Sequence, residues 1–343
     1  MSERLLTWRE LNRALLARQL LLERGALSIP KALERIGGIQ AQYAPSMYIG
    51  LWSRLDGLER NALTRALERR AVVQATMMRA TIHLVSRADY WPLTAGIRDE
   101  RRAWWERVHK QADPKRARAT AKKLRAMLAG RPRRWKEIQE RFGRTEALAA
   151  AQYVDLVRVP PSGTWEQRRA DLYGLAEEWV GPDEADPDLG LELLLRRYLA
   201  AFGPATAADA ADFGMVSIGR VRAVLGRMQL RRYRDEDGRE LVDLPRAPLP
   251  PAETPVPPRF LPVWDATLLV HARRTRILPE EHRSKVFNTK TPNSVNTFLL
   301  DGQVAGTWRH ENGRVEIEPF ASIPRAARKE LDEEAERLAA FHS

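Results

Sequence analysis

The chain has 343 residues, no cysteine, and 57 Lys plus Arg against 45 Asp plus Glu, which gives a net charge of +12. The absence of cysteine excludes disulfide scaffolds, thiolate zinc sites, iron–sulfur clusters and thiol nucleophiles. A hydrophobic fraction of 44% excludes a chain held unfolded by its charge, and the length suffices for two or three domains. The excess positive charge favours a polyanionic partner.

The first hundred residues predict short helices followed by two strands. Thr7 and Glu10 have the spacing of a capping box at the start of a leucine-rich helix. Ser28 is the expected N-cap of a second helix, and a third spans residues 61–70. The apolar runs 72–78 and 81–85 predict strands that turn between them. Helices followed by a small hairpin are typical of a winged helix.

The net charge is confined to residues 101–144. This segment has 16 Lys and Arg and four Asp and Glu, so it carries +12 and the rest of the chain is neutral. Apolar residues between Trp104 and Leu128 follow a helical stripe with cations around it. A solvated helical face is the alternative interpretation. Because the cations are mostly arginine, which binds phosphate bidentately and stacks on bases, we favour nucleic acid.

The pattern of helices followed by a hairpin recurs twice. Helices are expected at 135–142 and 146–156, a strand at 157–159, and a turn at 160–163. Further on, helices are expected at 191–201, 207–213 and 221–228, before a hairpin that turns at Asp237 and Gly238. The sequence therefore predicts three winged helices, over residues 1–115, 116–186 and 187–247.

A stiff linker and a β-module complete the predicted architecture. Residues 245–262 contain eight prolines. Strands are expected beyond them at 260–264, 268–270, 297–300, 304–308 and 315–317, with hairpin turns at 301–302 and 312–313 and a final helix from Pro324. The predicted fold is mainly α with small β-hairpins (α+β): tandem winged helices plus a small barrel-like all-β module over 248–343.

Several functional classes lack support in the sequence. No P-loop, glycine-rich dinucleotide motif, HExxH or GxSxG pattern occurs. The six histidines have no metal-ligand spacing, so we expect neither a metal nor a cofactor. No segment has the ~20 uncharged apolar residues of a membrane helix, and the N-terminus does not resemble a secretory signal. We expect a monomeric cytoplasmic protein, and the Arg- and Ala-rich composition is typical of a GC-rich bacterium, where it would work on the nucleoid.

One polar segment between two predicted helices carries the candidate chemistry. Gln40 and Gln42 are two residues apart, with Gly37 and Gly38 before them and Pro45 after. A loop whose amides satisfy nearby backbone groups is the alternative. The segment resembles the QxQ motif of the AlkZ-like winged-helix DNA glycosylases, whose relatives with QxD differ at the second position. Further blocks of this sequence resemble the same family in the same order: 79–84, 158–165, 198–206, 261–283 and 301–309.

This resemblance implies a monofunctional DNA glycosylase with Gln40 and Gln42 as its catalytic residues. Such proteins are similar in removing N7-alkylated purines from double-stranded DNA, and some unhook interstrand crosslinks. The implied biology is alkylation repair or self-resistance to a DNA-alkylating natural product. Neutral amides suit this reaction because an N7-alkylated purine is already cationic and leaves without protonation, so only the attacking water must be positioned. We expect no strand-nicking lyase step.

Other candidate DNA contacts lie outside the glutamine pair. Arg79, Thr81 and His83 alternate along a predicted strand, although His83 is equally typical of a buried hairpin histidine. The remaining candidates are Arg158, the turn residues Ser162 and Thr164, and a basic cluster in the β-module formed by Arg273, Arg274, Arg276, His282 and Arg283. A plain tight turn and a solvated surface are the respective alternatives for the last two groups.

Two rival functions remain open at this point. A winged-helix transcriptional regulator would prefer one operator over bulk DNA, because fold does not determine function. A non-catalytic DNA-damage binder would lose only affinity when either glutamine is replaced. The glycosylase hypothesis instead predicts that the basic segment governs salt-dependent binding while the uncharged glutamines govern turnover.

Overall fold

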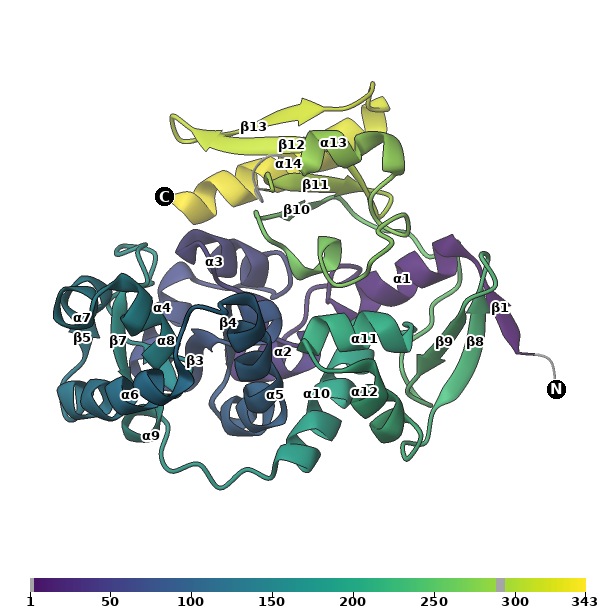
Figure 1. Cartoon of the computed structure of the whole chain (residues 1–343). Coiled ribbons are helices and arrows are strands. Elements are labelled where there is room, and N and C mark those ends of the chain that lie inside the picture. Colours follow the sequence, from purple (N-terminus) through teal and green to yellow (C-terminus); the bar gives the residue numbers. More distant parts are fainter. Residues whose placement is uncertain (1–2, 288–293) are drawn as a thin grey trace.

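The computed structural model describes residues 3–287 and 294–343, which form three sheets of six, four and three strands. In Figure 1 the helices of residues 114–179 lie at the left, and those of residues 187–225 lie to the right of them. The β-module lies across the top of the view. No helix in the described ranges is long and apolar enough to cross a membrane.

The six-stranded sheet is built from both of the first two predicted units. Its strands are β2 (Ile39–Gln40), β3 (Val72–Thr76), β4 (Ile82–Ser86), β5 (Arg133–Arg134), β6 (Leu156–Arg158) and β7 (Leu172–Leu175). They are arranged in the order β2-β4-β3-β6-β7-β5, and all of the pairs are antiparallel. Backbone hydrogen bonds between β3 and β6 therefore hold the two units together, whereas the sequence predicted separate hairpins.

Alternation along these strands separates two hydrophobic cores. Val73 and Ala75 of β3 face the core shared with the long helices, while Val72 of the same strand faces the core under α3. The surrounding helices are α1 (Trp8–Arg18), α2 (Ile29–Ile36), α3 (Ala44–Trp52), α4 (Arg60–Glu68), α5 (Arg87–Val108), α6 (Pro114–Leu128), α7 (Trp135–Phe142), α8 (Arg144–Ala150) and α9 (Ala176–Trp179). The capping box of Thr7 and Glu10 is confirmed. The helix expected at 146–156 is wrong beyond Ala150, because Leu156 begins a strand paired on both sides.

The third predicted unit packs tightly against the first. It consists of α10 (Pro187–Phe202), α11 (Ala207–Gly214), α12 (Ile218–Leu225), β8 (Arg231–Asp235) and β9 (Glu240–Asp243). The hairpin expected around Asp237 and Gly238 is confirmed, and strand β1 (Arg4–Leu6) adds to it in parallel. A Cβ on Gly190 of α10 would lie 2.2 Å from the Pro92 carbonyl oxygen of α5. Glycine at this position allows the two helices to approach so closely.

The β-module is an open sheet in the described residues, in place of the barrel-like arrangement that we expected. Its elements are β10 (Arg259–Leu261), η2 (Ala266–Leu268), η3 (Glu280–His282), α13 (Arg283–Val286), β11 (Thr297–Leu300), β12 (Gln303–Glu311), β13 (Arg314–Pro319) and α14 (Arg325–His342). The sheet order is β10-β11-β12-β13, and α14 packs against β10 and β13. The strand expected at 268–270 is wrong, because the Asp265 side chain accepts a bond from the Thr267 N–H and caps a 3₁₀ turn.

Two buried ion pairs tie the parts together. The Arg18 guanidinium of α1 binds both carboxylate oxygens of Asp243 at 2.8 Å. Arg54, which follows α3, binds both oxygens of Asp265 in the β-module at 3.0 and 2.9 Å. Because all four side chains are buried, loss of one partner would leave an uncompensated charge.

Candidate active site

Two glycines allow the segment with the glutamine pair to reach the edge of the six-stranded sheet. Gly37, which caps the end of helix α2, has a φ of 77°, and Gly38 follows with a φ of 81°. A Cβ on Gly38 would lie 3.1 Å from a Val85 methyl and 3.2 Å from the Leu84 carbonyl oxygen, both on β4. The chain then pairs with β4, so that Gln40 lies opposite His83. Directly opposed residues of an antiparallel pair project to the same side of the sheet.

Gln40 is buried and bound to Arg79. Its side chain is 5% exposed, and its Oε1 accepts a hydrogen bond of 2.9 Å from Nη2 of Arg79. Arg79 lies in the turn η1 (Met78–Ala80) between β3 and β4, with a φ of 52° that few non-glycine residues adopt. Its Nη1 is buried without a partner in the described part of the chain. Burial lowers the pKa of Arg79 to about 10, so the guanidinium remains charged at neutral pH.

Gln42 is exposed, and the backbone holds its amide. Its Oε1 accepts a 2.7 Å hydrogen bond from the N–H of Ile82, the first residue of β4. Both glutamine oxygens thus have one protein donor each. A carbonyl oxygen has two lone pairs, so each one can still accept a hydrogen bond from water. The arrangement provides two oriented acceptors at one end of the hairpin β3–β4.

His83 and Thr81 belong to the same hairpin, where His83 is buried and Thr81 is partly buried. His83 is 2% exposed, and its Nδ1 lies 3.1 Å from the Thr81 carbonyl oxygen. This contact assigns the proton to Nδ1. Burial, together with the nearby Arg79, lowers the pKa of His83 to about 3, so the ring is neutral at pH 7. Thr81 donates its hydroxyl to the Met78 carbonyl oxygen at 3.1 Å.

A small cavity adjoins Gln40 where the β-module meets α3. Its volume is about 10 Å³, close to the minimum that holds one water molecule. Asp265 is the one carboxylate among the lining residues, and Arg54 occupies both of its oxygens. Trp264 also lines the cavity, with a φ of 65°. Arg54 and Trp264 were not among the predicted site residues. The sequence has no signal for the packing of the linker against α3 or for the strained φ of Trp264.

The second group of predicted contacts lies farther along the same sheet. Arg158 on β6 is opposite Gln74 of β3 and donates to the Thr76 hydroxyl at 2.8 Å. Ser162 is 3% exposed, and its hydroxyl donates to the Arg169 carbonyl oxygen at 2.6 Å. Thr164 is 2% exposed and donates to the Pro161 carbonyl oxygen at 2.7 Å. The two hydroxyls therefore stabilise their own turn, which matches the tight-turn alternative.

The predicted basic cluster of the β-module is divided between surface and interior. Arg273 is exposed and pairs with Asp237, and Arg283 is exposed and pairs with Glu280. Arg276 is 2% exposed and donates to the Pro204 carbonyl oxygen. Two partly buried members pack on aromatic rings: Arg274 on Phe287 and His282 on Phe320. The structure does not bring this cluster into contact with the glutamine pair through any described hydrogen bond.

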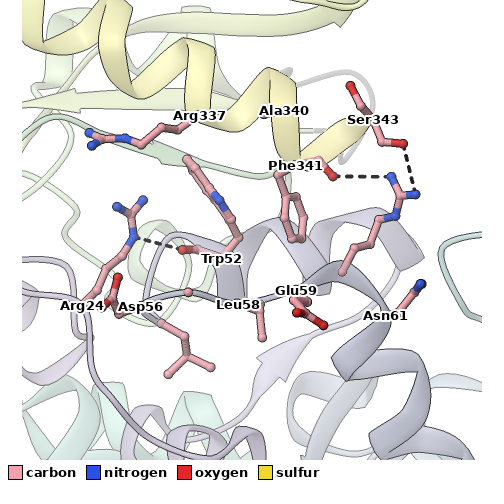
Figure 2. A pocket seen from close by; sticks show the side chains of 13 residues that line it. Arg24, Trp52, Asp56, Leu58, Glu59, Asn61, Arg337, Ala340, Phe341 and Ser343 are labelled. Carbon is pink, nitrogen blue, oxygen red and sulfur yellow. Dashed lines mark hydrogen bonds between the residues drawn. The ribbon is translucent and has the colours of Figure 1, made fainter.

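A larger surface hollow lies elsewhere. It has a volume of about 640 Å³ and is formed between α14 and residues 52–61, as Figure 2 shows. Arg24 bonds to the Trp52 carbonyl oxygen there at 3.1 Å, and Phe341 projects between the two elements. No group of three or more His, Cys, Asp or Glu in the described ranges is arranged to hold a metal ion.

Comparison with known proteins identifies the family. The model of the family described as DNA glycosylase AlkZ-like matches residues 33–341. The structure is similar to that of the Streptomyces sahachiroi DNA glycosylase AlkZ, with a TM-score of 0.81 and 20% sequence identity over 98% of this chain and 97% of that one. No curated protein matches the sequence. The likeness confirms a mixed fold of helices and small sheets, while the division into tandem winged helices stays a prediction. The family predicted from the glutamine motif is confirmed. The chain belongs to the AlkZ-like DNA glycosylase family.

Proposed function

We propose that the protein is a monofunctional glycosylase that hydrolyses the N-glycosidic bond of cationic N7-alkylpurines in double-stranded DNA. The observation that carries the proposal is the glutamine pair, with the Oε1 of Gln40 bonded to Arg79 and that of Gln42 bonded to Ile82. Both amides are held in one orientation before substrate binds. Such preorganisation is what a site needs to position a water molecule.

The chemistry follows from the charge of the substrate. Hydrolysis of an ordinary glycoside uses one carboxylic acid to protonate the leaving group and a carboxylate as base or nucleophile. An N7-alkylpurine carries its positive charge already and departs as a neutral base. The glutamine oxygens then need only align a water behind the sugar carbon, while the water's proton passes to solvent. An unmodified purine, which is neutral, should be spared.

Arg79 positions the catalytic pair in this proposal. Its Nη2 holds Gln40, whereas its Nη1 is buried and therefore not accessible to the DNA backbone in this structure. The exposed cations of α5, of α6 and of the turn between them supply the phosphate contacts and the bulk of the salt-dependent affinity: Arg107, Lys110, Lys115, Arg116, Arg118, Lys122, Lys123 and Arg125.

The finer substrate range follows from the exposure of Gln42. An acceptor at the surface can approach an adduct that is tethered to the opposite strand, and we therefore extend the proposal to interstrand crosslinks. Glutamine has no amine to form a Schiff base, so a lyase step is not proposed. The monomeric protein would act in alkylation repair or in self-resistance.

The test is release of free base from duplex DNA with a single N7-methylguanine. Wild type should release 7-methylguanine and leave the strand unnicked, while Gln40→Ala and Gln42→Ala should release little or none. Equal release of unmodified guanine or adenine would contradict the proposed chemistry. Tight binding without release by wild type would favour the damage binder, and strong preference for one undamaged sequence would favour the regulator.

A further inference from the structure

A second pocket, separate from the glutamine pair, is walled by aromatic side chains. Its volume is about 350 Å³, within the range of sites that hold a small ligand. Trp104 and Trp105 line it from α5, Trp135 from the first residue of α7, and Tyr173 from β7. Trp104, Trp135 and Tyr173 are each only partly buried, so their rings retain surface for a further contact. We call this site the aromatic pocket.

Two arginines give the aromatic pocket a positive charge. Arg158 is 7% exposed; it donates to the Thr76 and Tyr173 hydroxyls, while its Nε is buried without a partner in the described residues. Arg101 also lines the pocket and bonds to the Thr76 carbonyl oxygen. None of the lining residues is acidic. A buried guanidinium without a carboxylate is poorly compensated, and an anion from outside would complete it.

One hairpin connects the aromatic pocket to the candidate active site. Thr76 and Ala80 line the pocket from the end of β3 and from η1. Thr76 pairs with Ile82, whose N–H holds Gln42, and Ala80 directly follows Arg79, which holds Gln40. A ligand in the pocket would therefore lie against the same turn that positions both amides.

We infer that the aromatic pocket binds an unstacked nucleotide of the DNA, with its base on the tryptophans and its phosphate at Arg158. Aromatic rings stack on any nucleobase, and arginine donates bidentately to phosphate, so the residue types match both halves of a nucleotide. The basic segment 101–144 contributes Arg101, Trp104 and Trp135, so the pocket is part of the surface that we assign to DNA. The inference rests on the proposed function only in taking DNA as the ligand.

Photocrosslinking tests the occupant directly. Single-stranded oligothymidylate with one 5-iododeoxyuridine is irradiated with the full-length protein, and the crosslinked residue is mapped by mass spectrometry. We expect attachment at Trp104, Trp135 or Tyr173. By fluorescence anisotropy, Trp104→Leu and Arg158→Gln should each bind the same strand about 5- to 150-fold more weakly, the decrease expected when a protein can no longer stack one base or bind one phosphate group.

Controls separate a loss of binding from a loss of folding. Trp179 is partly buried outside the pocket, under Arg70, so Trp179→Leu should bind as wild type does. All variants should show the same thermal unfolding midpoint within a few degrees; if Arg158→Gln does not, Trp104→Leu alone decides. Crosslinks confined to other residues, together with unchanged affinity of Trp104→Leu, would overturn the inference.

The outcome is independent of catalysis. The probe is undamaged and the readout is attachment, so the inactive variant Gln42→Ala should crosslink at the same residues. If 7-methylguanine is released but no crosslink maps to the pocket, the pocket inference alone fails. If crosslinks map to the pocket but no base is released, the proposed glycosylase reaction alone fails.

Discussion

Replacement of Arg79 tests how the site holds its amides. In the structure, Nη2 of Arg79 donates to Oε1 of Gln40 at 2.9 Å, and burial lowers the pKa of the guanidinium to about 10. Arg79→Met removes the donor and keeps most of the side-chain volume. Without it the Gln40 amide is free to rotate, and its NH₂ group can face the place where an acceptor is needed. We therefore class Arg79 as a positioning residue.

The magnitude follows from the kind of bond. A hydrogen bond to a charged group contributes about 1.5–3 kcal/mol, which corresponds to a decrease of about 10- to 150-fold in the rate of base release. Single-turnover release of 7-methylguanine from duplex DNA measures this rate at saturating protein. Arg79→Lys keeps the charge without the planar fork, so partial recovery of the rate is expected.

A second readout distinguishes positioning of Gln40 from simple phosphate binding. If positioning dominates, kcat decreases while the Kd for undamaged duplex and its salt dependence change little. If Arg79 acts only as a phosphate contact, affinity decreases and the slope of log K against log salt becomes less steep by about 0.9. A folded Arg79→Met variant that releases base at the wild-type rate would refute the assigned role of the Arg79–Gln40 bond.

Three further outcomes are expected. Gln40→Ala and Gln42→Ala should abolish base release and retain the wild-type salt dependence of duplex binding; a shallower salt slope would contradict the separation of binding from chemistry. Lys122 and Lys123 are exposed on α6. If both contact phosphate, replacing both by alanine should make the slope of log K against log salt for duplex binding less steep by about 1.8. An unchanged slope in filter-binding titrations would exclude these two lysines of α6 from the interface. The pKa of His83 is lowered to about 3 in the folded state, so between about pH 6.5 and pH 3 the ring is protonated in the unfolded state only. The free energy of unfolding should therefore decrease as the pH falls below about 6.5, by up to about 1.4 kcal/mol per pH unit. Urea unfolding at pH 7 and pH 5 should show a smaller difference for His83→Asn than for wild type, and an equal difference would count against a neutral buried ring.

Local signals in the sequence determined many of the elements. The capping box of Thr7 and Glu10, the turn at Asp237 and Gly238, and the period of α7 depend on neighbours within a few residues, and all three are found in the structure. The ordered blocks around the glutamine motif were enough to identify the family. The localisation of the net charge to residues 101–144 also needed only the sequence.

The tertiary structure decided which of the polar residues face outward and what they bind. Arg276, Ser162 and Thr164 have the residue types of DNA contacts, yet their polar groups are buried and bonded inside the chain. The bond between Arg79 and Gln40 spans 39 positions and needs a left-handed turn that no residue type at position 79 would suggest. Burial, strand pairing between β3 and β6, and the aromatic pocket all depend on partners distant in the sequence. Composition and periodicity report the preferences of a residue, but its environment is set by the elements that pack around it.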